Sequence, residues 1–287
     1  MSRLFIFLQY LLPQHLLSRL TGKLAAGTFL KNFLIRIFIK RYRVDLSEAE
    51  ITDPTQFENF NAFFTRALKP GARPLPTEDN VILCPADGAI SEIGPIEEDL
   101  ILQAKGRYYS TAKLLADEAF AEKFRGGNFA TIYLSPRDYH RVHIPLEGTL
   151  VKTTYVPGDL FSVNRVTADS VPDLFARNER LVCLFDTPVG AMAVVLVGAM
   201  IVAGIETVWS GEVCPSKIKT VSHTDYAEHS PPVQLATGAE LGRFKLGSTA
   251  IVLFEPGAVA LEPELSADTP VQMGQILARI THVKESA

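Results

Sequence analysis

The chain has 287 residues, of which 47% are hydrophobic, enough to bury the core of one large domain or two small ones. Its net charge of −4 is unevenly placed: residues 1–44 carry eight Lys and Arg and no Asp or Glu, so the rest carries −12. Three cysteines without a Cys-x-x-Cys pair argue against a disulfide framework and suit a reducing compartment. The basic segment predicts an anionic surface as partner, and its many large aliphatic residues favour lipid over nucleic acid.

Two apolar stretches at the N-terminus, residues 4–12 and 29–39, predict helices. The second places Leu30, Phe33, Leu34, Ile37 and Phe38 on one helical face. Neither stretch reaches the roughly 20 apolar residues of a bilayer span. Residues 1–44 are therefore predicted to form a basic amphipathic arm lying in a membrane interface. Two alternatives stay open, a helical pair docked on the protein's own core and a secretory signal peptide, although no small-residue cleavage site follows.

The body, residues 45–287, has a different pattern. A short helix is predicted over residues 58–68, a Pro-rich turn over 70–76 and a second helix over 111–120. From residue 81 onward, short β-branched runs alternate with turn signals and predict strands. These runs are residues 81–84, 129–134, 150–156, 181–185, 191–197, 249–254 and 258–261. The predicted fold class is α+β, with a β-rich barrel or sandwich and the helices concentrated at the N-terminus.

A Gly247-Ser248 step precedes the predicted strand 249–254. A serine hydroxyl at the entry of a buried strand can attack the carbonyl just before it, and glycine leaves that carbonyl uncrowded. Taken alone, the step favours an ordinary turn before a strand. A serine nucleophile also needs a base that removes its proton and a carboxylate that orients the base.

Two further stretches supply groups of that kind. Of the six histidines, only His140 and His143 lie in a segment dense with functional groups, and Asp87 follows a predicted strand. The spacing does not establish that these side chains meet. The His-x-x-His pair also suits half of a metal site, and Asp87-Gly88 also suits a turn. No further His or Cys cluster accompanies the pair, so no metal is predicted.

Six motifs follow one another along the chain: Pro85-Ala-Asp-Gly88, Tyr133-Leu-Ser-Pro-Arg-Asp-Tyr-His-Arg-Val-His143, Val156-Pro-Gly-Asp-Leu-Phe-Ser-Val-Asn164, Phe175-Ala-Arg-Asn-Glu-Arg180, Ile205-Glu-Thr-Val-Trp209 and Phe244-Lys-Leu-Gly-Ser-Thr249. In this order they resemble the motifs of bacterial phosphatidylserine decarboxylases. The resemblance runs through nearly all of the chain, including the basic apolar arm.

The resemblance implies a pyruvoyl-dependent enzyme that cuts itself and converts phosphatidylserine to phosphatidylethanolamine. Asp87, His143 and Ser248 would form the self-processing triad, and His140 would serve decarboxylation, with a proton-donor role as the candidate. Cleavage between Gly247 and Ser248 would give a large chain, 1–247, and a small chain, 248–287. Ser248 would become the pyruvoyl group, which forms a Schiff base with the substrate amine.

The resemblance also implies a place for the protein in the cell. The enzyme would bind an anionic phospholipid membrane peripherally, at the cytoplasmic side of the inner membrane, through residues 1–44. Residues 45–287 would form the catalytic domain, and two processed pairs would form a homodimer.

Other functional classes stay open. A serine hydrolase would use Ser248, His143 and Asp87 without self-cleavage, but the chain lacks the Gly-x-Ser-x-Gly elbow. A non-enzymatic peripheral membrane-binding protein would account for the arm and for residues 271–280, which resemble the closing strands of barrel-sandwich domains. A pyruvoyl enzyme acting on a soluble amino acid would have no need of the arm.

Overall fold

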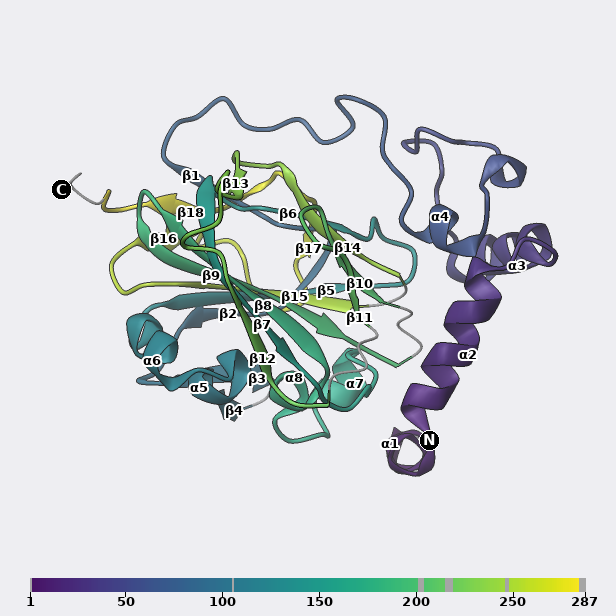
Figure 1. The fold of residues 1–287 in the computed structure, drawn as a ribbon, viewed down its shortest axis with the longest axis horizontal. Helices are drawn as coiled ribbons and strands as arrows, with labels where there is room; N and C mark the ends of the chain where they lie inside the picture. The colour runs from purple at the N-terminus through teal and green to yellow at the C-terminus, as the bar shows by residue number, and fades with distance from the viewer. Residues whose placement is uncertain (1, 105, 201–203, 215–218, 246–247, 284–287) are drawn as a thin grey trace.

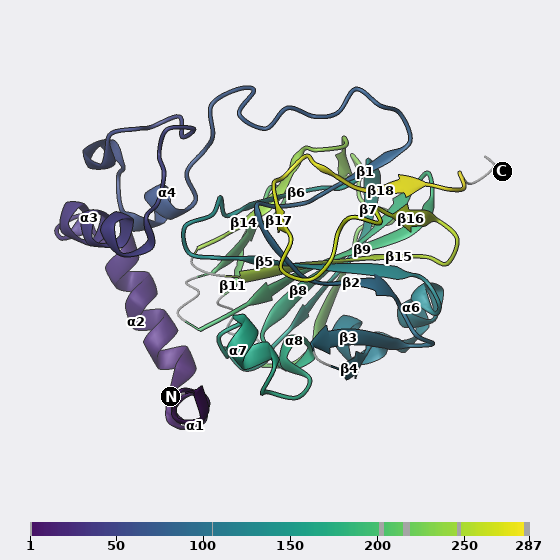
Figure 2. The same ribbon diagram turned by 180° about the vertical axis from the view of Figure 1, so that it is seen from behind.

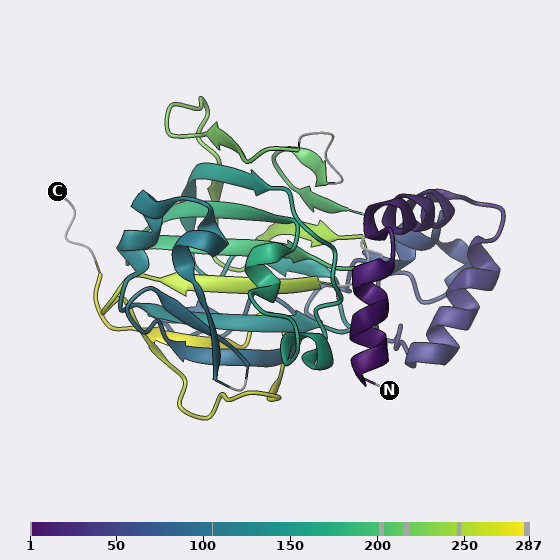
Figure 3. The ribbon, with the colours of Figure 1, turned by 90° about the horizontal axis from the view of Figure 1, so that it is seen from below.

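The computed structural model describes residues 2–104, 106–200, 204–214, 219–245 and 248–283. Helices at the N-terminus group at one side of a β-rich body (Figures 1 and 3). The long segment between α4 (Phe60–Phe64) and β1 (Val81–Leu83) runs from these helices across the body (Figure 1). No helix within the described ranges is long and apolar enough to cross a membrane.

The N-terminal part contains three longer helices and one short one: α1 (Ser2–Leu11), α2 (Gln14–Ala26), α3 (Lys31–Tyr42) and α4 (Phe60–Phe64), with a 3-10 turn η1 (Pro54–Gln56). Pro13 immediately precedes α2, a position where its missing N–H breaks no helical hydrogen bond. Asn59 caps α4 by accepting a hydrogen bond from the Ala62 N–H at 2.9 Å. A small apolar core joins these helices, with Ile35 and Phe63 fully buried in it.

The centre of the body is a nine-stranded antiparallel sheet in the order β12-β7-β8-β9-β15-β5-β2-β17, with β13 also paired to β7. Its strands are β2 (Gly88–Pro95), β5 (Asn128–Leu134), β7 (Gly148–Val156), β8 (Arg180–Thr187), β9 (Gly190–Gly198), β12 (Ser222–Asp225), β13 (Gln234–Leu235), β15 (Ser248–Phe254) and β17 (Pro270–Val271). Every residue of β9 and β15 is buried, as expected for strands covered on both faces.

Two smaller sheets cover one face. The four-stranded sheet has the order β11-β10-β14-β6 and the three-stranded sheet the order β1-β18-β16. Their strands are β1 (Val81–Leu83), β6 (Arg141–His143), β10 (Ile205–Thr207), β11 (Gly211–Cys214), β14 (Glu240–Phe244), β16 (Val259–Leu261) and β18 (Ile276–Ile280). One apolar cluster, which includes Ile82, Leu241 and Val252, joins these sheets to the central one.

A second apolar cluster fills the opposite face of the central sheet. It is covered by the hairpin β3 (Leu100–Ala104) and β4 (Arg107–Ser110), and by α5 (Thr111–Leu115), α6 (Glu118–Ala121), η2 (Glu122–Phe124), α7 (Arg165–Ala168) and α8 (Leu174–Arg177) (Figure 2). The helix predicted over residues 111–120 is therefore two helices. Ala116 separates them because it adopts the left-handed conformation, with φ of 52°.

The prediction of an α+β fold is confirmed, and all seven predicted strand runs form strands. The architecture is layered and open: among the described strands, β12 and β17 end the central sheet, and no barrel closes. The barrel alternative was therefore wrong, because the two covering sheets pack on the central one instead of extending it into a closed ring.

The arm is attached to the body by polar groups and leaves apolar ones exposed. Gln9 of α1 is buried, and its Oε1 accepts from the Ser162 N–H at 2.8 Å. Gln14 accepts from the Leu160 N–H at 2.6 Å. In contrast, 15 of the 22 exposed large hydrophobic side chains among the described residues lie within residues 4–42, including Phe29 with 95% of its surface exposed.

Candidate active site

The register of three neighbouring strands brings the candidate residues to one end of the central sheet. In β5, Tyr133 pairs with Ala89 of β2 on one side and with Thr249 of β15 on the other. Asp87, two residues before Ala89, and Ser248, one residue before Thr249, therefore lie at the same end as the loop that leaves β5 after Leu134.

That loop carries both histidines back across the sheet end. The His143 N–H donates to the Pro85 carbonyl at 2.8 Å, beside Asp87. The His140 carbonyl accepts from the Phe244 N–H at 3.0 Å. Phe244 precedes Ser248 by four residues, a length of chain that reaches at most about 14 Å. His140, His143, Asp87 and Ser248 thus occupy one region, although they come from three separate parts of the sequence.

Ser248 is fully buried at the start of β15, in register with Leu134 and Gly198 of the two neighbouring strands. Its hydroxyl has no hydrogen-bond partner among the described residues. A buried hydroxyl without a partner is unfavourable, and a catalytic role is one of the explanations for such a group in a native protein. Gly247, the other half of the predicted cleavage site, lies outside the described residues.

The imidazole of His143 is held in one tautomer. Nδ1 lies 2.8 Å from the Gly238 carbonyl, which can only accept, so Nδ1 carries the hydrogen. Nε2 therefore has the lone pair, and it accepts a hydrogen bond from the Tyr139 hydroxyl at 3.1 Å. Burial lowers the pKa of His143, while the Gly238 hydrogen bond and the charges of Glu240 and Asp87 oppose that shift. His143 is a neutral base whose basic nitrogen faces Tyr139.

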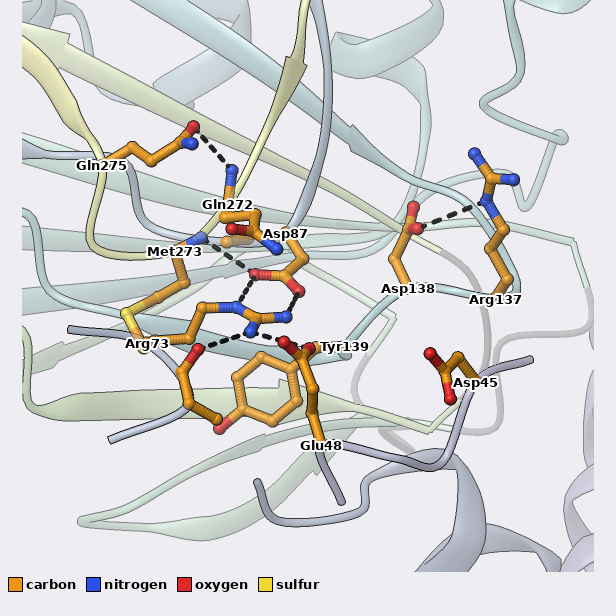
Figure 4. A network of polar contacts seen from close by, with 12 residues as sticks. Asp45, Glu48, Arg73, Asp87, Arg137, Asp138, Tyr139, Gln272, Met273 and Gln275 are labelled. Atoms are coloured by element: carbon orange, nitrogen blue, oxygen red, sulfur yellow. Dashed lines mark hydrogen bonds and ion pairs between the residues drawn. The ribbon is translucent and has the colours of Figure 1, made fainter. Parts of the chain in front are cut away.

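Asp87 is buried and makes three hydrogen bonds (Figure 4). Oδ1 accepts from Arg73 Nε at 3.0 Å and from the Met273 N–H at 2.9 Å, and Oδ2 accepts from Arg73 Nη2 at 2.5 Å. Because both ring nitrogens of His143 bind other groups, no direct Asp87–His143 hydrogen bond forms between these two described residues. The Asp87 charge still acts on His143 through space.

Gly88 explains why a glycine follows this aspartate. A Cβ atom at position 88 would overlap the Tyr133 carbonyl oxygen of the adjacent strand. The Asp-Gly pair therefore begins β2 in close contact with β5 and does not form an isolated turn.

His140 is fully buried and packs against Phe64, with ring centroids 4.0 Å apart. Nδ1 donates to the Asp138 carbonyl at 2.8 Å, so Nε2 has the lone pair, and Nε2 has no partner among the described residues. Burial lowers the pKa of His140 to about 3, although the Asp138 hydrogen bond opposes the shift. The resting His140 is thus a proton acceptor, and it can act as a donor only after taking up a proton.

Comparison with known proteins identifies the family of the chain. A family profile described as phosphatidylserine decarboxylase matches residues 60–279, and a second, described as PSD, matches residues 4–43. The chain belongs to the phosphatidylserine decarboxylase family.

Relatives that match nearly the whole chain support the same family. A phosphatidylserine decarboxylase proenzyme from Pseudomonas aeruginosa is 62% identical over 282 residues, which is 96% of this chain and 97% of the relative. The proenzyme from Ectopseudomonas mendocina is 62% identical over 96% of this chain and 98% of its own. That from Pseudomonas fluorescens is 60% identical over 96% of both chains.

Several residues of the site were not predicted from the sequence. Tyr139 lies inside the motif that carries the histidines, so its proximity to them was an available signal. Phe64 and Arg66 come from the α4 region and cover the site from the N-terminal side; Arg66 Nη2 donates to the Arg137 carbonyl at 2.9 Å. Arg73 lies in the Pro-rich turn, where no local pattern indicates a role.

The residues described here include no group of three or more His, Cys, Asp and Glu side chains arranged to hold a metal ion. The buried cysteines Cys84, Cys183 and Cys214 are unpaired thiols, and burial raises the pKa of Cys84 to about 12.

Proposed function

We propose that this chain is a proenzyme that cuts itself before Ser248 and then converts phosphatidylserine to phosphatidylethanolamine. The observation that carries the proposal is the buried, unpaired Ser248 hydroxyl at the sheet end where two neutral histidines present Nε2 lone pairs. Family membership and the proenzyme names of the relatives agree with it.

Self-processing requires a base for the Ser248 hydroxyl. His143 Nε2 is free to accept that proton once the Tyr139 hydroxyl moves aside, and the nearby Asp87 charge stabilises the imidazolium that forms. The Ser248 oxygen then attacks the Gly247 carbonyl, and the peptide bond becomes an ester. A base then removes the Cα proton of residue 248, and elimination breaks the bond between Cβ and the ester oxygen, which leaves a carboxylate on residue 247 and gives dehydroalanine at position 248. Tautomerisation and hydrolysis of dehydroalanine release ammonia and leave a pyruvoyl group.

The residues fit such a group, because Ser248 lies in β15 between β5 and β9, and its hydroxyl oxygen has no hydrogen-bond partner among the described residues. When present, a pyruvoyl group supplies an electrophilic carbonyl for the substrate amine and a sink for the electron pair released with carbon dioxide. His140 serves the same reaction by moving protons. Its Nε2 takes one from the substrate ammonium and returns it to the carbon that has lost carbon dioxide.

The arm suits a lipid substrate. Its exposed apolar side chains lie among seven Lys and Arg residues between positions 19 and 43, a combination that favours anionic phospholipid surfaces. Residues 1–44 thus act as a membrane-binding arm for a catalytic domain of residues 45–287. We place the enzyme peripherally at the cytoplasmic side of the inner membrane, as a homodimer of processed pairs.

The test is the intact mass of the purified protein under denaturing conditions. We expect two chains, with the small chain, 248–287, lighter by about 17 Da than a peptide that begins with serine, because ammonia is lost. The Ser248→Ala variant should give one uncut, inactive chain. A single uncut wild-type chain with full activity would refute the pyruvoyl mechanism and favour a hydrolase.

A further inference from the structure

The side chain of Arg73 spans two acidic residues. On one edge it binds both oxygens of Asp87, at 3.0 and 2.5 Å. On the other, Nη1 donates to Glu48 Oε2 at 2.8 Å and to the Ala72 carbonyl at 2.7 Å. Only 7% of the Arg73 side chain is exposed, compared with 50% for Glu48. The guanidinium is thus largely removed from solvent, and four of its five N–H groups donate to these partners.

The contacts of Arg73 connect the N-terminal segment around Glu48 to Asp87, a residue of the proposed self-processing site. The Glu48 segment is tied to the residues after α4, since the Lys69 N–H donates to the Glu48 carbonyl at 2.9 Å. Arg73 follows four residues later. The third hydrogen-bond donor to Asp87 is the N–H of Met273, which belongs to the small chain that cleavage would create. Asp87 is therefore clamped between the N-terminal segment and the C-terminal part.

The fixed position of Asp87 matters because its carboxylate makes no hydrogen bond to His143. Without Arg73, the Asp87 carboxylate could rotate toward the His143 imidazole or the Tyr139 phenol. Two hydrogen bonds from one guanidinium fix the plane of both carboxylate oxygens. Fixed in this way, Asp87 acts on His143 by its charge, and Arg73 offsets part of that charge. The other ionisable groups that influence His143 are Glu240, Arg141 and Tyr139.

We infer that Arg73 is a positioning residue for self-processing: it fixes the Asp87 carboxylate and sets how strongly that carboxylate acts on His143, and Glu48 orients Arg73. This inference rests on the proposed self-cleavage. Lysine at position 73 would keep the positive charge but could not bind both carboxylate oxygens in one plane.

The experiment follows the appearance of the small chain after cell-free synthesis of the full chain, from pH 5.5 to 8.5. We expect Arg73→Gln to cut about tenfold more slowly at its best pH, and Arg73→Lys about threefold, because the carboxylate loses its fixed plane. Arg73→Gln also changes the charge of the Glu48–Arg73–Asp87 cluster from −1 to −2, which favours the imidazolium form of His143. The acid limb of its pH–rate profile should therefore move to higher pH, whereas Arg73→Lys should not move it.

Arg279→Gln is the matched control, because Arg279 also pairs with two carboxylates, Glu78 and Glu262, but on the exposed surface. It should cut like the wild type. A purely structural role of Arg73 would reduce the amount of cut protein without shifting the limb.

The outcomes separate the two proposals. A wild-type chain that never cuts would overturn the proposed function. A wild-type chain that cuts, together with Arg73→Gln of unchanged rate and limb, would overturn only the role of Arg73. If Arg73→Gln fails to fold, Arg73→Lys tests the role of Arg73. Self-cleavage of Arg73→Lys at the wild-type rate would show that binding both oxygens of Asp87 is unnecessary.

Discussion

The Tyr139 hydroxyl donates to Nε2 of His143 at 3.1 Å, so this contact occupies the lone pair that would accept the Ser248 proton in the proposed self-cleavage. The opposite ring nitrogen is fixed by Gly238. Burial raises the pKa of Tyr139 to about 12, so its hydroxyl keeps the proton that it donates. Gly238 thus sets the tautomer of the base, and Tyr139 sets its availability.

Tyr139→Phe should therefore leave self-cleavage intact, with a rate within about threefold of the wild type, because it removes a competitor for Nε2 and not the base. His143→Ala should not cut at all. Both are measured by the appearance of the small chain. A Tyr139→Phe precursor that stays uncut would show that the hydroxyl itself relays the proton.

His140 predicts a pH dependence of stability. Its folded pKa of about 3 lies below the ordinary value of 6.5, so the unfolded chain binds more protons between these two values. Stability is then full above pH 6.5 and falls as the pH drops toward 3. Between pH 7.5 and 5.0 the loss due to His140 should be about 2 kcal/mol.

The measurement is denaturant unfolding in a Ser248→Ala background, which keeps one uncut chain. Adding His140→Gln should remove about 2 kcal/mol of the pH dependence. His229→Gln, in an exposed loop, is the control and should leave the dependence unchanged. If the free energy of unfolding changed equally with pH in the chains with and without His140, the His140 imidazole would not be buried in its neutral form.

Phe64 connects the N-terminal helices to the site through its contact with His140. Phe64→Ala should destabilise the uncut Ser248→Ala chain by about 3 kcal/mol, since it opens a cavity over a buried ring. Water admitted beside His140 should also weaken the pH dependence described above. Phe64→Leu should lose less stability and keep most of that dependence; equal effects of the two substitutions would argue against a packing role.

The arm predicts membrane binding that depends on apolar side chains as well as charge. Replacing Phe29 and Phe33 by Ser should weaken binding to anionic phospholipid vesicles at least about a hundredfold, since the two exposed rings should each contribute about 1.5 kcal/mol or more on insertion. Tyr108→Ser, at an exposed site on the body, should not change binding. Raising the salt concentration should weaken the wild type further. Sedimentation with vesicles measures all three, and equal binding of wild type and double variant would refute this role of the arm.

The sequence predicted the local elements better than their assembly. The β-branched runs became strands because a fully buried strand needs apolar side chains on both faces, and β9 and β15 have them. Helix α2 was missed because Pro13 resembles a break, although proline is tolerated where a helix begins. The helix predicted over residues 58–68 is shorter, as α4 ends at Phe64 and Arg66 turns toward the Arg137 carbonyl.

The candidate site was predicted by residue type but not by contact. His140, His143, Asp87 and Ser248 lie at one sheet end, which the spacing of their motifs did not establish. The partner of Asp87 was unexpected, because the path of the linker that carries Arg73 depends on tertiary packing. Met273 is 186 residues from Asp87, a separation at which no local pattern indicates a contact.

The position of β15 affects whether the protein can refold after cleavage. This strand, which would begin the small chain, is hydrogen-bonded along its whole length to β5 and β9 of the large chain. Before cleavage, β15 belongs to the same polypeptide as β5 and β9. An unfolded molecule can therefore refold by itself, at a rate that does not depend on protein concentration. After the cut, recovery requires two separate polypeptides to meet and to insert one strand into the middle of a sheet. Each molecule would therefore have a single opportunity to fold efficiently, and the mature enzyme would last only as long as its first fold does.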